Sequence, residues 1–134
     1  IALDATPRRR PGGETPEEIL RQIREHYPDA LVMGEISTLE EAERIIPMGF
    51  DLISTTLSGY TRESQEVKAV NLDLIRQIHA ITDIPIIAEG KIRCEQEAVE
   101  ALKAGAHAVV VGTSITRPEI ITERYVEAIR EVED

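Results

Sequence analysis

Short apolar runs and longer amphipathic stretches alternate along this chain. The apolar runs, which predict strands, cover residues 1–3, 31–33, 50–54, 85–90 and 106–111. Each run is followed by a stretch with apolar residues at helical spacing, and these stretches cover about 15–27, 38–46, 71–81, 95–104 and 118–132. Strands that alternate with helices and read as continuous apolar runs predict a parallel α/β fold.

Helix starts give the clearest local signals. Thr15 followed by Glu18, and Thr38 followed by Glu41, have the spacing of capping boxes. The last helical stretch carries an apolar stripe, which we expect to face inward. The residues of this stripe are Ile121, Tyr125, Ala128, Ile129 and Val132.

Two architectures are compatible with five strand–helix units. One is a doubly wound sheet of five strands. The other is part of a (β/α)₈ TIM barrel, of which this chain would supply about five units. Each unit takes about 25 residues, and eight such units would give roughly 200–250 residues, the usual size of a barrel.

Glu89 stands at the carboxyl end of the apolar run 85–90 and is followed by Gly90. A carboxylate has no packing reason to lie there, and the glycine lets backbone or ligand approach closely. The carboxyl ends of parallel strands are where ligands bind in both architectures. We therefore interpret Glu89 as a functional residue; a Glu that only bonds the next loop is the structural alternative.

Other polar residues follow the strands in the same way. Asp4 and Glu35 come after the first and second runs, and the hydroxyl residues Thr55 and Thr56 come after the third. Hydroxyls bind sugar or phosphate oxygens, but they also satisfy turns. The pattern predicts a polar site assembled from several strand ends.

The fifth run leads into Gly112-Thr113-Ser114, with Arg117 shortly afterwards at the start of a helix. Backbone N–H groups exposed by glycine, a helix start and a guanidinium favour a phosphate site. A glycine-rich turn with a solvent-exposed arginine is the alternative. The cluster Arg8, Arg9 and Arg10 could also meet an anion, but we expect it to be solvated.

Composition narrows the classes of function. The 134 residues fit a single domain, residues 1–134, with 42% hydrophobic residues, and the net charge of −10 argues against non-specific binding to nucleic acid or to anionic membranes. The single Cys94 allows no internal disulfide and favours the cytoplasm, and no apolar run approaches a membrane span. No metal-ligand spacing, Walker-type loop or Ser-His-Asp arrangement is visible. Metal-free acid/base chemistry on a phosphorylated small molecule is the resulting interpretation.

Six segments resemble the N-acetylmannosamine-6-phosphate 2-epimerase family in their order and spacing, and they cover essentially the whole chain. They are ALDAT at 2–6, VMGE at 32–35, TTLSGYT at 55–61, IAEG at 87–90, VVG at 110–112 and ITRP at 115–118. The segments at 55–61 and 115–118 are the most specific. The resemblance implies a (β/α)₈ barrel of which residues 1–134 form the C-terminal portion, strands four to eight.

The resemblance also implies an activity and a site. The family interconverts N-acetylmannosamine 6-phosphate and N-acetylglucosamine 6-phosphate in the breakdown of sialic acid and amino sugars, without a cofactor, and we expect a cytoplasmic homodimer for the complete protein. By resemblance Glu89 is the active-site glutamate. The pocket residues implied for the substrate are Asp4, Glu35, Thr56 and Gly90, and those for its phosphate are Gly112, Thr113 and Arg117.

Two departures from the family affect these expectations. The family's catalytic lysine belongs to a segment that this chain lacks, and Lys91 does not correspond to it, so we expect residues 1–134 to be inactive by themselves. Gly34-Glu35 stands where the family usually has Ala-Asp. Another phosphate-binding barrel, of the pentose-phosphate epimerase or aldolase type, and a non-catalytic α/β module remain the alternatives.

Overall fold

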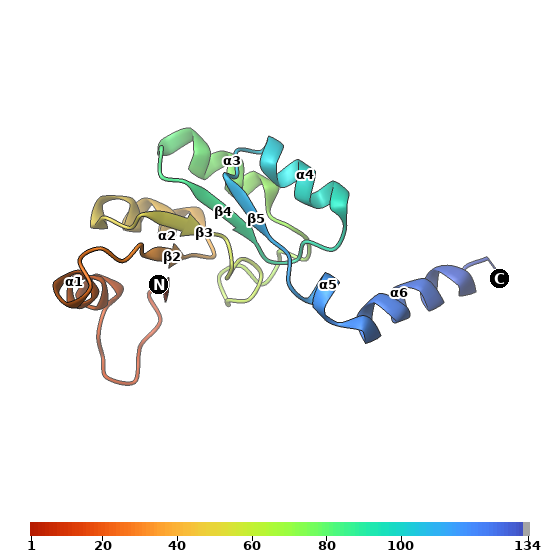
Figure 1. The fold of residues 1–134 in the computed structure, drawn as a ribbon, viewed down its shortest axis with the longest axis horizontal. Coiled ribbons are helices and arrows are strands. Elements are labelled where there is room, and N and C mark those ends of the chain that lie inside the picture. The colour runs from red at the N-terminus through yellow and green to blue at the C-terminus, as the bar shows by residue number, and fades with distance from the viewer. Residues whose placement is uncertain (133–134) are drawn as a thin grey trace.

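The chain forms one parallel sheet in the computed structural model, which describes residues 1–132 (Figure 1). Its strands are β1 (Ala2–Asp4), β2 (Met33–Glu35), β3 (Leu52–Ser54), β4 (Ile86–Glu89) and β5 (Ala108–Val110). They lie in the order β1-β2-β3-β4-β5, and every neighbouring pair is parallel. A doubly wound sheet would reverse its order at a switch point, whereas consecutive strands are neighbours in a barrel. The order therefore excludes the doubly wound alternative.

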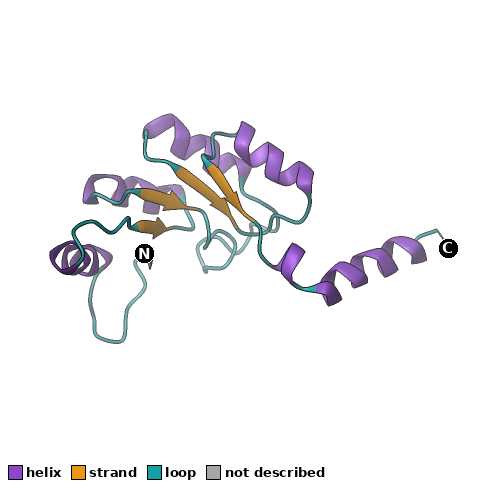
Figure 2. Ribbon diagram, in the orientation of Figure 1, coloured by secondary structure: helices purple, strands orange, loops and turns teal. Residues whose placement is uncertain are grey.

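Helices connect the strands (Figure 2). They are α1 (Pro16–His26), α2 (Leu39–Ile45), the 3₁₀ turn η1 (Ile46–Met48), α3 (Leu72–Ile81), α4 (Glu95–Lys103), α5 (Thr113–Thr116) and α6 (Pro118–Arg130). α3 packs on β4 and on α4, and α4 packs on β5. Within residues 1–132, no helix combines the length and the apolar character needed to cross a membrane.

The strands do not coincide with the apolar runs that predict them: β1 and β2 are shifted along the chain, and β3, β4 and β5 are shorter than their runs. The run 31–33 overlaps β2 only at Met33, because the ladder begins where Met33 is level with Ala2 on one side and Leu52 on the other. Val32 lies outside the strand but is fully buried in the core. Hydrophobicity marks burial, while the limits of a strand are set by pairing with its neighbours.

The core lies between the sheet and the helices, and Gly34 shows how closely they approach. A Cβ atom at Gly34 would lie 2.6 Å from Cδ1 of Ile45 in α2 and 3.1 Å from the ring of Phe50. The side-chain position at Gly34 therefore faces the helices. Because successive side chains of a strand point to opposite faces, Glu35 points to the face away from α2.

The expected burial of the last helix is wrong. None of the side chains of α6 is buried, and Tyr125 and Ile129 of its apolar stripe are 70% and 60% exposed. Figure 1 shows α6 (blue) extending away from the sheet. The amphipathic pattern predicts the helix correctly, but burial also requires a surface to pack against, and the described residues do not supply one.

Candidate functional site

The predicted carboxylates gather at the carboxyl edge of the sheet. Asp4 of β1 is level with Glu35 of β2, and Glu35 is level with Ser54 of β3. Residues that are level in parallel strands point to the same face, so these three side chains share the face away from the helices. Glu89 of β4 lies two residues beyond Ile87, which pairs with Ser54.

Glu89 is held by two consecutive threonines that follow β3. The hydroxyl of Thr56 donates to Oε2 of Glu89 at 2.9 Å. The hydroxyl of Thr55 accepts from the backbone N–H of Glu89 at 3.1 Å and donates to its backbone carbonyl at 3.0 Å. Side chain and backbone of Glu89 are thus both fixed from the end of β3. The sequence places Thr55 and Thr56 near the site but does not reveal this contact.

Glu35 has a raised pKa. Burial is the largest cause, and the like charges of Glu89 and Asp4 act in the same direction. The nearby Thr56 hydroxyl and the Arg8 guanidinium both oppose the rise. Glu35 therefore keeps its proton to a higher pH than an ordinary glutamate.

Asp4 is bound by its own loop, and the expectation that the arginine cluster is solvated holds for the exposed Arg8 and Arg9 but not for Arg10. Thr6 donates to Oδ1 of Asp4 from its backbone N–H at 2.9 Å and from its hydroxyl at 2.7 Å. Arg8 forms an ion pair with Oδ2, and a guanidinium nitrogen of Arg10 lies 3.6 Å from Oδ1. Arg10 also donates to the carbonyl of Thr6 at 2.9 Å, so the loop folds back over the end of β1. Of the three arginines, Arg9 has no partner among the described residues.

Most of the remaining predicted residues share one cavity. An open cavity of about 850 Å³ adjoins the end of β4. The predicted residues that line it are Thr56, Glu89, Gly90, Gly112 and Thr113. The structure thus brings the carboxylate of β4 and the glycine turn after β5 to the same space.

Asp4, Glu35 and Arg117 do not line this cavity. Asp4 and Glu35 lie further along the same edge, at the ends of β1 and β2. Arg117 is exposed, and its Nε lies 2.6 Å from a carboxylate oxygen of Glu119. The short helix α5 separates it from the glycine turn, so its phosphate role stays a prediction.

Lys91 also lines the cavity, although sequence reasoning sets it aside. Its ammonium lies 4.1 Å from the centre of the Tyr60 ring, a cation–π contact. Lys91 has the left-handed backbone angle φ = 60° and follows Gly90, whose φ is 99°. These two angles mark a tight turn directly after Glu89. A lysine just past a strand-end Glu-Gly is the signal that could have found it.

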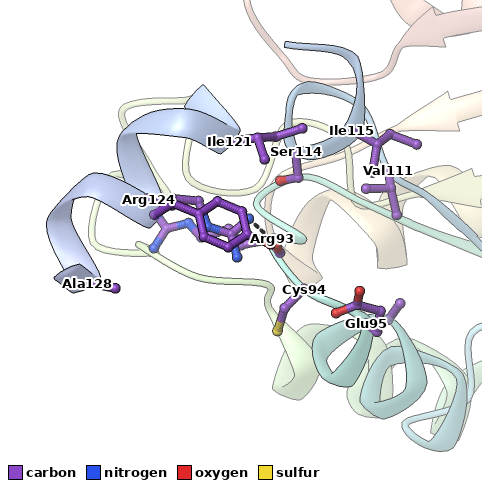
Figure 3. A pocket seen from close by; sticks show the side chains of 11 residues that line it. Arg93, Cys94, Glu95, Val111, Ser114, Ile115, Ile121, Arg124 and Ala128 are labelled. Atoms are coloured by element: carbon purple, nitrogen blue, oxygen red, sulfur yellow. Dashed lines mark hydrogen bonds between the residues drawn. The ribbon is translucent and has the colours of Figure 1, made fainter. Parts of the chain in front are cut away.

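A second cavity, of about 680 Å³, lies between the start of α4 and α6 (Figure 3). Figure 3 shows Ile121 and Arg124 on one side, and Cys94 at the start of α4. Arg124 donates to the backbone carbonyl of Arg93 at 2.8 Å. Of the predicted phosphate turn only Ser114 lines this cavity, and Arg93, Ser114 and Arg124 line the first cavity as well, so the two cavities adjoin. Between residues 1 and 132, no group of three or more His, Cys, Asp and Glu side chains is placed to hold a metal ion.

The strand order and the position of the site define the class of protein. A parallel sheet with consecutive strands as neighbours is a partial β/α barrel, and its candidate site lies at the carboxyl edge, where barrels have their functional sites. The family model described as "Putative N-acetylmannosamine-6-phosphate epimerase" matches residues 1–131. The chain belongs to this family.

Individual relatives agree with this assignment. A protein of Caldanaerobacter subterraneus subsp. tengcongensis named "Putative N-acetylmannosamine-6-phosphate 2-epimerase" is 53% identical over 131 residues, which cover 98% of this chain and 55% of that protein. A protein of the same name from Enterobacter sp. strain 638 is 47% identical, over 96% of this chain and 56% of that protein. The chain thus spans about half the length of the curated relatives it matches.

Solved structures support the fold. The N-acetylmannosamine-6-phosphate 2-epimerase from Clostridium perfringens superimposes with a TM-score of 0.87 at 43% identity, over 95% of this chain and 55% of that one. A thiamine phosphate pyrophosphorylase from Pyrococcus furiosus superimposes with a TM-score of 0.62 at 23% identity, over 98% of this chain and 59% of that one. The second likeness concerns the fold alone.

Proposed function

We propose that the complete protein interconverts N-acetylmannosamine 6-phosphate and N-acetylglucosamine 6-phosphate. The observation that carries the proposal is the position of Glu89. Two threonines fix Glu89 beside a cavity at the carboxyl edge of the sheet, and the chain belongs to the epimerase family. Only one carboxylate oxygen of Glu89 accepts a hydrogen bond within residues 1–132. The second oxygen is therefore available to a substrate.

The chemistry requires a base of this kind. The carbon that bears the acetamido group is α to the aldehyde when the sugar ring is open, so its proton can be removed to give an enolate. Reprotonation on the other face yields the epimer. We assign one proton transfer to Glu89. The opposite face requires a second group with a different pKa, for which the resemblance implies a lysine that residues 1–134 do not include.

The other residues of the site fit the two ends of such a substrate. Gly90, Gly112 and Thr113 line the cavity and offer backbone N–H groups to the phosphate. Asp4 and Glu35, which lie further along the edge, are assigned to the sugar hydroxyls. Thr56 lines the cavity beside Glu89, and Arg117 is assigned to the phosphate. Arg117 would have to leave Glu119 to reach it.

We further propose that residues 1–134 are the C-terminal portion of an eight-stranded barrel. Five units are present, and three more would complete the barrel. The coverage of 55% of the relatives' length supports this division. We place the complete protein in the cytoplasm, as a homodimer that acts in the breakdown of sialic acid and amino sugars.

Proton–deuterium exchange at C2 tests the activity. The complete protein is incubated with N-acetylmannosamine 6-phosphate in deuterated water and followed by NMR. We expect loss of the C2 proton signal together with formation of the epimer, and a loss of at least about a thousandfold in rate for Glu89→Gln, because the amide cannot take a proton. We expect the polypeptide 1–134 alone to give no exchange.

Three outcomes would contradict the proposal. If the complete protein is folded but gives no exchange, it is not this epimerase. Pentulose phosphates would then be tested as substrates, as for another phosphate-binding barrel. Full activity of the Glu89→Gln variant would show that Glu89 is not the base. Exchange by residues 1–134 alone would show that no lysine outside them is needed.

A further inference from the structure

We propose that Thr56 is a positioning residue that orients the Glu89 carboxylate with its single hydroxyl hydrogen. The inference rests on the proposed function for the role of Glu89. It departs from the expectation that Thr56 binds the substrate directly. The contact joins residues 33 positions apart in the chain, so only the folded sheet brings it about.

The neighbours of Thr56 determine where its hydrogen goes. Its Oγ1 lies 2.9 Å from Oε2 of Glu89 and 2.6 Å from Oγ of Ser54. A hydroxyl has one hydrogen to donate and can accept from two partners. A carboxylate can only accept, so Thr56 donates to Glu89 and Ser54 donates to Thr56. Ser54 is completely buried, so water does not reach this end of the chain of hydrogen bonds.

Thr55 fixes the backbone beneath this contact. Its hydroxyl both accepts from the N–H and donates to the carbonyl of Glu89. Consequently the backbone of Glu89 is held by one threonine and its carboxylate by the next. A long side chain with one oxygen anchored presents the other oxygen in a restricted set of directions, which is what proton transfer at a defined carbon needs.

Glu35 lies near the same hydroxyl. Burial and the charge of Glu89 raise the pKa of Glu35, and the nearby Thr56 hydroxyl lowers it. The one hydrogen of Thr56 is nevertheless donated to Glu89, so Glu35 does not share it.

The test compares two variants of Thr56 in the complete protein. Thr56→Val keeps the shape but removes the hydroxyl, and Thr56→Ser keeps the hydroxyl. We expect Thr56→Val to lower kcat for C2 exchange about tenfold with little change in KM, because the base is misoriented while the substrate still binds. We expect Thr56→Ser to restore kcat to within about twofold of the wild type.

Thr61→Val is the matched control. Thr61 lies in the same loop, but its hydroxyl contacts Ser37 and Ser64 at 2.9 and 2.8 Å. It therefore reports what the loss of a loop hydroxyl does to folding, without a change at Glu89. We expect lower thermal stability and a kcat near that of the wild type.

Several results would overturn the inference. Thr56→Val with unchanged kcat, or with a raised KM and unchanged kcat, would make Thr56 dispensable or a direct substrate ligand. Equal losses of kcat in Thr56→Val and Thr61→Val would make the effect one of folding.

An NMR measurement separates this inference from the proposed function. If the wild type shows no exchange, the proposed function fails, but the carboxyl signal of Glu89 can still be followed with carboxyl-labelled glutamate. We expect this signal to shift in Thr56→Val and to keep its position in Thr61→Val, because only the first loses the hydrogen bond to Oε2 of Glu89. An unchanged signal in Thr56→Val would show that Thr56 does not orient the Glu89 carboxylate.

Discussion

Gly59 and Lys91 lie against each other beside the cavity. A Cβ at Gly59 would be 2.2 Å from Cε of Lys91 and 2.4 Å from the backbone carbonyl oxygen of Val67. Gly59 also has the left-handed angle φ = 80°. Gly49 has a similar φ of 90°, but a Cβ there would meet no atom within 4 Å. Gly49 thus needs glycine for its backbone alone, and Gly59 needs it for backbone and space.

This difference predicts unequal effects of the same substitution. We expect Gly49→Ala to lower the free energy of unfolding by about 1 kcal/mol, the cost of a left-handed non-glycine residue. We expect Gly59→Ala to lower it by roughly 2–3 kcal/mol, because the carbonyl of Val67 is backbone and cannot swing aside. Urea unfolding of both variants of the complete protein measures this. Equal losses of unfolding free energy in the two variants would mean that Lys91 and Val67 move away from the added methyl group at no cost.

Two helices begin with the same capping box but in different surroundings. In α1, the exposed Glu18 carboxylate accepts from the backbone N–H and the hydroxyl of Thr15 at 2.8 and 3.1 Å, and the backbone N–H of Glu18 donates to that hydroxyl at 3.2 Å. In α2, Glu41 is only 6% exposed, and it accepts from the backbone N–H and the hydroxyl of Ser37 at 2.7 and 2.8 Å. Water can replace the carboxylate at α1 but has little access at α2.

We therefore expect Glu41→Ala to destabilise the protein by about 2–3 kcal/mol, since it leaves the buried N–H and hydroxyl of Ser37 without their acceptor. Glu18→Ala is the matched control, and we expect a clearly smaller loss. Hydrogen bonds from Thr15 lower the pKa of Glu18. The stability that Glu18 gives to the fold is therefore present above the ordinary pKa of a glutamate, and it is lost as the pH falls through the lowered value. Urea unfolding at neutral and acid pH measures both variants. A similar loss of unfolding free energy in both variants at neutral pH would show that the burial of Glu41 does not increase its contribution to stability.

The sheet is open at both ends, because β1 pairs only with β2 and β5 only with β4 within the described residues. Unpaired strand edges offer free N–H and C=O groups to other chains. The apolar stripe of α6, with Tyr125 and Ile129, is exposed as well. The net charge of −10 opposes association, and salt weakens this repulsion.

We expect the isolated polypeptide 1–134 to self-associate, and to do so more strongly at high salt. The double variant Tyr125→Ser and Ile129→Ser removes apolar area from α6 and should shift the distribution toward the monomer. The double variant Glu123→Ser and Glu127→Ser, on the same helix, should not. Sedimentation velocity distinguishes these cases. A monomer at all salt concentrations would show that the open edges and α6 are covered within the chain itself.

Much of the fold and part of the site follow from local sequence. The two capping boxes and the alternation of strands and helices depend on residues close together in the chain. Glu89 could be selected because a carboxylate after a buried strand has no packing role. The hydrogen bond from Thr56 to Glu89 could not be predicted, because it depends on the register between β3 and β4, which the sequence does not give.

Sequence was thus sufficient for the elements, the α/β class and the edge at which the site lies, since these follow from the periodicity of burial and from the direction of parallel strands. The tertiary structure alone showed the strand order, the ion pairs of Asp4 and the exposed face of α6. It also accounts for the raised pKa of Glu35, which results from burial and from charges on other strands. The physical reason is distance: hydrogen bonds, desolvation and Coulomb interactions act over a few ångströms in space, whatever the separation along the chain.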